Sequence, residues 1–213
     1  MRVLPLLLVL LAGPAAAADW PDTPLARLSA QAQVQGLNAE LLSRDSATAT
    51  LQRWCDAHGP GGGARIVARR ITGADKTPGE AERRDLKVTA EAPVAYRRVE
   101  LACGDKVLSE ADNWYLPARL TPAMNTALNT TQTPFGVVVR PLDFRRRTLA
   151  AEALFQPLPA GWEGRPLPAA GPGTLAVPHE ILRHRAVLAT PDGTPFSLVV
   201  ETYTDATLIE PRS

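Results

Sequence analysis

The spacing of apolar residues changes near Ala64, and this change constrains the fold more than any other feature of the chain. Before Ala64, apolar residues recur at helical spacing, as Leu51, Trp54 and Cys55 do. After it, apolar and charged residues alternate, as they do from Tyr96 to Cys103. Alternation with a period of two is the pattern of a half-buried strand. The sequence therefore predicts helices first and a sheet afterwards.

The helical part carries recognisable start and stop signals. Thr23 followed by Pro24 is a helix N-cap with proline at the first helical position. A second short helix is expected to begin near Asn38. Ser46 is expected to cap a third helix, which Gly59 ends.

The remaining chain predicts strands joined by turns. Strands are expected over 65–71, 96–103, 107–116, 137–142, 148–155, 182–189 and 195–204. Thr121 and Pro122 repeat the capping signal and predict one inserted helix that ends near Thr131. Segments 72–84 and 157–178 are rich in Gly, Pro or polar residues and are expected to be loops. The predicted class is α+β, with a mainly antiparallel sheet, N-terminal helices and one inserted helix.

Residues 1–18 have the pattern of a cleavable secretory signal. Arg2 precedes an apolar run that Gly13 and Pro14 interrupt, and four alanines follow. This run is shorter than the about 20 apolar residues that a membrane span needs, and no later run is long enough. We therefore expect residues 19–213 to be a single exported domain without a membrane span, located in the periplasm or secreted.

The charge of the mature chain argues against nucleic acid as a partner. Loss of Arg2 leaves 22 of the 23 basic residues, which balance the 22 acidic residues. A neutral chain has no general attraction for phosphate backbones. The three histidines form no ligand cluster and no CxxC spacing occurs, so the sequence predicts neither a metal nor another cofactor.

Cys55 and Cys103 are the two cysteines of the chain. In an oxidising compartment they could form one disulfide, although spacing alone does not establish the geometry. The alternative is a pair of small buried apolar side chains.

Glu201 is the most unusual charged residue, because it follows an apolar strand segment directly. A buried carboxylate needs a partner. Arg98, Arg183 and Arg185 are the candidates, and the last two lie on one face of a strand because they are two residues apart. A simple ion pair at the sheet surface would also explain these residues.

Four segments resemble chorismate lyase, in the same order along residues 38–205. They are Leu41-Leu42-Ser43-Arg44-Asp45-Ser46-Ala47-Thr48, Arg98-Val99-Glu100-Leu101-Ala102-Cys103-Gly104-Asp105, Thr133-Pro134-Phe135-Gly136, and the closing hairpin from Arg183 to Tyr203. The resemblance implies an antiparallel sheet with helices, a fold that the ligand-binding domains of some bacterial regulators share.

The resemblance also implies roles for individual residues. Arg98 would bind a substrate carboxylate, Phe135 would lie in the turn that contacts the ligand, and Glu201 would be the acid or base. Arg183 or Arg185 would hold the second carboxylate of chorismate while pyruvate is eliminated.

Three functional hypotheses follow from these residues. The chain could act as a lyase on chorismate or an analogue, or it could bind a small aromatic carboxylate without catalysis. It could also be an interaction protein in which Glu201 forms a structural ion pair. The sequence does not indicate an oligomeric state.

Overall fold

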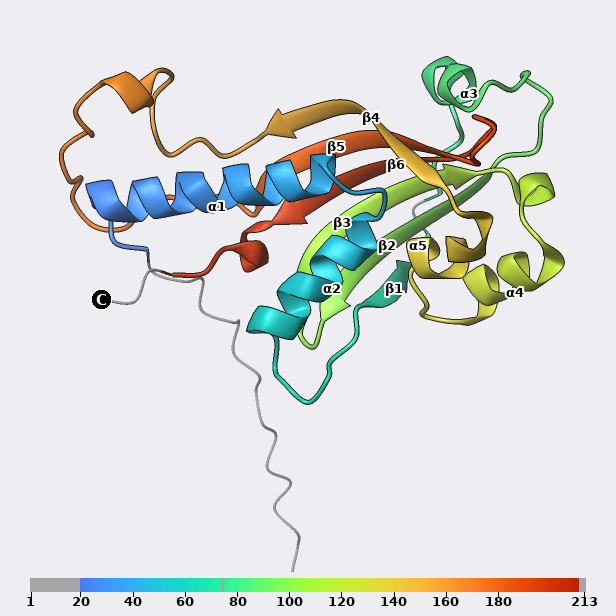
Figure 1. The fold of residues 1–213 in the computed structure, drawn as a ribbon, viewed down its shortest axis with the longest axis horizontal. Coiled ribbons are helices and arrows are strands. Elements are labelled where there is room, and N and C mark those ends of the chain that lie inside the picture. The colour runs from blue at the N-terminus through green and yellow to red at the C-terminus, as the bar shows by residue number, and fades with distance from the viewer. Residues whose placement is uncertain (1–19, 74, 211–213) are drawn as a thin grey trace, which may run out of the picture.

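The computed structural model of the chain describes residues 20–73 and 75–210 (Figure 1). The predicted signal, residues 1–18, lies outside the described residues. The helices are α1 (Pro24–Leu42), α2 (Ala47–His58), α3 (Glu80–Leu86), α4 (Pro122–Thr130) and α5 (Phe135–Val138). The strands are β1 (Val67–Ile71), β2 (Ala95–Cys103), β3 (Lys106–Tyr115), β4 (Arg145–Ala153), β5 (Glu180–Ala189) and β6 (Pro195–Thr204). Short 3-10 helices lie at Pro117–Arg119, Arg140–Leu142, Trp162–Gly164 and Asp205–Thr207.

The strands form one antiparallel sheet in the order β1-β2-β3-β6-β5-β4. Hairpins join β2 to β3 and β5 to β6, and the pairing of β3 with β6 places these hairpins side by side. The predicted α+β class with a mainly antiparallel sheet is confirmed. No helix among the described residues is long and apolar enough to cross a bilayer.

Helices α1 and α2 cover one face of the sheet, which we call the inner face (Figure 1). Val34 of α1 and Leu51 of α2 belong to the same buried cluster as Val99 and Ala111 of the sheet. Thr23 caps α1 and Ser46 caps α2, each through a side-chain oxygen that accepts a backbone N–H three residues later.

The opposite, outer face is covered at one end by α3. Leu86 of α3 packs there against Trp114 and Leu198. Elsewhere this face carries ion pairs, such as Arg98 with Glu110. The sheet therefore has a buried, mostly apolar inner face and a charged outer face beyond α3.

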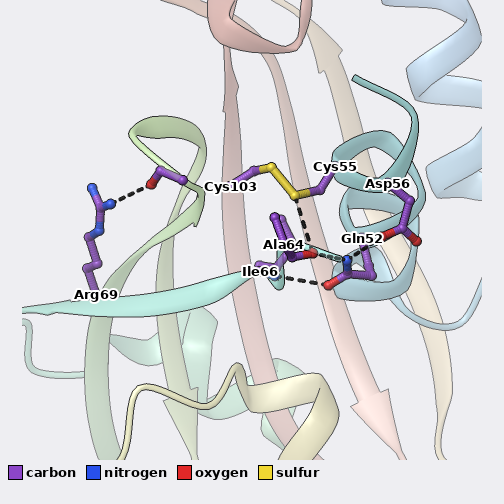
Figure 2. Close-up of a disulfide and its surroundings, with 8 residues drawn as sticks. Gln52, Cys55, Asp56, Ala64, Ile66, Arg69 and Cys103 are labelled. Carbon is purple, nitrogen blue, oxygen red and sulfur yellow. Dashed lines mark hydrogen bonds between the residues drawn. A yellow bond between two sulfur atoms is a disulfide. The ribbon is translucent and has the colours of Figure 1, made fainter. Parts of the chain in front are cut away.

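A disulfide joins Cys55 of α2 to Cys103 at the end of β2, with 5.7 Å between their Cα atoms (Figure 2). Both residues are buried. The side chain of Gln52 lies beside them, donating to the Ala64 carbonyl and accepting from the Ile66 N–H. A Cβ at Gly59 would lie 2.6 Å from the Cys103 sulfur, so a residue without a side chain is needed there.

Three predicted elements differ in the structure. The strand expected over 137–142 is instead α5 followed by a 3-10 turn, because Phe135 and Val139 are both buried at the four-residue spacing of a helix. The loop expected over 72–84 contains the start of α3, where the Glu82 side chain accepts the N–H of the capping Gly79. The helix expected from Asn38 is the last part of a continuous α1.

Candidate functional site

A cavity of about 40 Å³ lies against the inner face of the sheet. The beginning of α2 provides Ser46 and Thr48, and α5 provides Phe135. The sheet provides Arg97 and Glu201 among other side chains. One water needs about 10–15 Å³ by this measure, so the cavity has room for a few waters or a group of similar size.

Arg97 is a buried cation without an acidic partner among the described residues. The residue is 2% exposed, and its Nε and Nη1 atoms have no hydrogen-bond partner there. Its Nη2 atom makes only a long contact of 3.5 Å with the Thr133 carbonyl. Burial lowers the pKa of Arg97, and the positive charge of Arg70 lowers it further. An unpaired buried charge is costly to the fold, so Arg97 indicates a site for an anion.

A second buried arginine in the cavity has a partner. Arg146 Nη2 lies 2.7 Å from Glu201 Oε2, and the two side chains are 2% and 7% exposed. This contact is an ion pair of two buried side chains. The Tyr203 hydroxyl donates to the same Glu201 oxygen at 3.1 Å. Burial lowers the pKa of Arg146, but the Glu201 and Tyr203 side chains together outweigh this and leave the pKa raised.

His184 lies beside this ion pair on β5, directly opposite Glu201 of β6. It is fully buried, and its Nε2 lies 2.7 Å from the Asn38 side-chain oxygen. In the tautomer in which Nε2 donates, Nδ1 is an acceptor, and it has no partner among the described residues. Burial and the nearby Arg146 charge lower the pKa of His184 to about 4. The imidazole is therefore neutral in the folded protein at pH 7.

We expect stability to fall as the pH drops from about 6.5 to about 4. In this window the unfolded chain protonates His184 while the folded protein does not, so proton uptake favours unfolding. The full shift corresponds to about 3 kcal/mol. Urea unfolding of the wild type and of His184→Gln across this range measures the effect. His58→Gln, which removes an exposed imidazole, is the control. An equal acid-induced loss in His184→Gln and wild type would contradict the assignment.

A larger groove of about 700 Å³ adjoins the inner cavity. Both spaces are lined by Ser46, Thr48, Gly136 and Phe144, so they meet between the start of α2 and α5. A Cβ at Gly136 would lie 3.1 Å from the Thr48 hydroxyl oxygen, so α2 and α5 approach closely at this boundary. We call the two spaces the inner cavity and the outer groove.

The structure brings together two of the residues singled out in the sequence. Phe135 and Glu201 both line the inner cavity. Arg98, Arg183 and Arg185 lie on the outer face instead. Arg98 pairs with Glu110, Arg183 with Glu180 and Glu152, and Arg185 with Glu82 and Asp85.

These positions correct the expected partner of Glu201. Its partner is Arg146, and the three expected arginines are separated from Glu201 by the sheet. Their strand positions explain this: Arg98 is opposite Asp112, which is opposite Val200, while Glu201 belongs to the neighbouring row and points to the other face.

Sequence reasoning missed the two arginines of the inner cavity. Arg97 shares a face with Val99 and Leu101 by the period of two, and that alternation could have identified it. Arg146 lies in the basic run 145–147, between the strands expected over 137–142 and 148–155, so it was assigned to neither strand. The run is the start of β4, in which Arg145 and Arg147 are exposed and the Arg146 side chain is buried.

Within the described part of the chain, no group of three or more His, Cys, Asp or Glu side chains could hold a metal ion. The polar side chains that line the inner cavity are two arginines, one amide, two hydroxyls and two carboxylates. Glu201 is paired with Arg146, and Asp45 accepts the backbone N–H of Arg146. This set suits an anionic organic ligand better than a metal.

Structural comparison finds domains of bacterial transcriptional regulators. The effector domain of PhnF from Mycobacterium smegmatis matches with 16% identity over 78% of this chain and 93% of that chain, at a TM-score of 0.49. A GntR-family transcriptional regulator from Enterococcus faecalis V583 matches with 12% identity over 68% and 99%, at 0.42. The possible transcriptional regulator YydK from Bacillus subtilis matches with 13% identity over 70% of this chain, at 0.42, and this chain spans 61% of its length.

Sequence comparison identifies a much nearer relative. No family model matches the sequence. The uncharacterized protein y4mC from Sinorhizobium fredii (strain NBRC 101917 / NGR234) is 52% identical over 193 residues, which cover 89% of this chain and 81% of that protein. The chain therefore belongs to the same family as y4mC.

Proposed function

We propose that the protein binds a small molecule through a carboxylate held by Arg97. The observation that carries this proposal is the burial of Arg97 in the inner cavity without an acidic partner among the described residues. A guanidinium binds a carboxylate through charge-assisted hydrogen bonds, and the N–H groups at Nε and Nη1 of Arg97 have no partner among the described residues. A bound carboxylate would compensate the charge that the fold leaves unpaired.

The walls of the site suit an aromatic or otherwise apolar ligand body. Phe135 and Phe144 line the inner cavity, and Phe144 also lines the outer groove. Both rings are held by contacts with Phe196, so they form a fixed apolar surface. The inner cavity holds no more than a group of a few atoms, so the carboxylate would occupy it and the ring would lie toward the groove.

The test is a thermal-shift titration with benzoate and 4-hydroxybenzoate, using benzamide as the uncharged counterpart. The acids should raise the melting temperature and benzamide should not, because a ligand stabilises only the state that binds it. Arg97→Met should abolish the shift. Arg98→Met is the matched control, since it changes the adjacent arginine on the outer face and should preserve the shift. Equal shifts for acid and amide would contradict a carboxylate site.

Without ligand, Arg97→Met should make the protein more stable. Replacing buried charges with apolar side chains is often neutral or stabilising by about 1–4 kcal/mol. A gain of 1 kcal/mol raises the melting temperature by roughly 2–4 °C in a chain of this size. Calorimetry of ligand-free wild type and Arg97→Met measures this gain. A clear loss of stability would show that Arg97 stabilises the ligand-free fold. That result would contradict a role limited to ligand binding.

Lyase activity on chorismate is the second candidate. It is favoured by the presence of Glu201 and Arg97 in the same cavity, since the resemblance assigns Glu201 the acid or base role. The ion pair with Arg146 occupies one Glu201 oxygen, which favours binding over proton transfer. Incubation with chorismate should give equal amounts of pyruvate and 4-hydroxybenzoate if the protein is a lyase, and Glu201→Gln should abolish both. Binding of 4-hydroxybenzoate without turnover would reject this candidate.

We also propose that the mature protein is exported. The disulfide supports this, because structural disulfides persist mainly in oxidising compartments. Expression of the full chain in a Gram-negative host, followed by fractionation and N-terminal sequencing, tests the proposal. A periplasmic product that begins near Asp19 is expected, and an uncleaved product in the cytoplasm would reject it.

A further inference from the structure

The outer groove is much larger than a single aromatic acid requires. The inner cavity accommodates a group the size of a carboxylate, whereas the groove of about 700 Å³ lies within the range of pockets that hold drug-sized ligands. Since both spaces share Ser46, Thr48, Gly136 and Phe144, one ligand can extend from the inner cavity into the groove.

The charge of the outer groove is positive. Arg65 and Arg140 line it, and none of its lining residues is acidic. Both arginines are exposed, and neither has an ion-pair partner within 4 Å among the residues that the structure describes. These two arginines are therefore available to an anion that enters the groove.

Much of the remaining groove lining is apolar, beside uncharged polar side chains such as Gln52 and Gln132. Ile66 and Val67 of the β1 region, with Pro134 and Val137 around α5, provide this surface. Val137 is 47% exposed and lines the groove. A ligand with an apolar middle part would cover it.

We propose that the physiological ligand is an elongated molecule with two acidic ends and an apolar spacer. One carboxylate binds Arg97 in the inner cavity, and the second lies between Arg65 and Arg140 in the outer groove. This inference rests on the proposed carboxylate site and adds the length of the ligand and its second charge.

The test uses 4-(ω-carboxyalkoxy)benzoates of increasing spacer length and the methyl ester of each ω-carboxylate. Diacid and half ester have nearly the same length, but only the diacid carries the second charge. We expect calorimetric titration at low salt to show about tenfold tighter binding of the best diacid than of its half ester. This advantage should shrink as the salt concentration rises, because Arg65 and Arg140 are exposed.

The double variant Arg65→Gln/Arg140→Gln should abolish the diacid advantage and leave the affinity for the half ester unchanged. Arg44→Gln is the control, since Arg44 is exposed and lines neither space. Equal binding of diacid and half ester by the wild type would overturn the second site while leaving the Arg97 site intact. A diacid advantage that survives in the double variant would also overturn it. Failure of both ligand types and of benzoate to bind would overturn the proposed function as well.

Discussion

Glu201→Ala is expected to destabilise the protein by about 3–5 kcal/mol, because it leaves the Arg146 charge buried without a partner. In a chain of this size the loss corresponds to a fall of roughly 10 °C in melting temperature. The Tyr203 hydroxyl, which is buried, also loses its acceptor. Urea unfolding at neutral pH measures the change in the free energy of unfolding.

A double variant separates the cost of the unpaired charge from the value of the ion pair. Glu201→Ala/Arg146→Met removes both charges and should recover most of the lost stability, since an apolar replacement for a buried pair is often tolerated. If the double variant is as unstable as Glu201→Ala, the loss comes from packing and not from the uncompensated arginine.

Glu110→Ala is the matched control on the opposite face of the sheet. Glu110 pairs with Arg98 at 2.8 Å, but both side chains are 31% exposed. Solvent screens such a pair, so its removal should cost about 0–1 kcal/mol. Similar losses of stability for Glu110→Ala and Glu201→Ala would contradict the prediction that the buried ion pair contributes more than the exposed one.

The alternation of residues in β2 contains information on both the strand and its buried face. Val99 and Leu101 identify the buried face, and Arg97 lies on that face because it precedes Val99 by two residues. Family resemblance placed the ligand-binding role on Arg98, which the structure places on the outer face. Strand periodicity was sufficient to locate the strand and to place Arg97, and not Arg98, on its buried face.

Other features depend on contacts that a single sequence does not contain. The segment 137–142 has the β-branched residues of a strand, but Phe135 and Val139 are buried on one side of a helical turn. The side chain of Arg146 becomes a partner of Glu201 only because β4 and β6 are both paired with β5. Long-range pairing of this kind cannot be read from local spacing.

Loss of the disulfide in Cys55→Ala/Cys103→Ala is expected to destabilise the protein by about 4 kcal/mol. The two cysteines are 48 residues apart, and opening a loop of this length increases the entropy of the unfolded chain by about that free energy. The urea dependence of unfolding should also become steeper, because the unfolded variant is less compact than the cross-linked chain.

Cys55→Ala alone should lose about as much stability as the double variant, because either change breaks the only cross-link that the described residues contain. Gln52→Ala is the control for local contacts around the disulfide, and it should cost less because the cross-link remains. A loss of less than about 1 kcal/mol in the double variant would show that the cross-link contributes little beyond ordinary packing.

The same variant tests whether the disulfide also supports the binding site. The disulfide fixes α2, which contributes Ser46 and Thr48 to the inner cavity, to β2, which contributes Arg97. If this attachment positions the two walls, the double cysteine variant should bind benzoate more weakly even at temperatures where it is fully folded. Unchanged affinity for benzoate in the folded variant would show that the disulfide contributes to stability but not to binding. The packing of α2 against the inner face would then be sufficient to position the site.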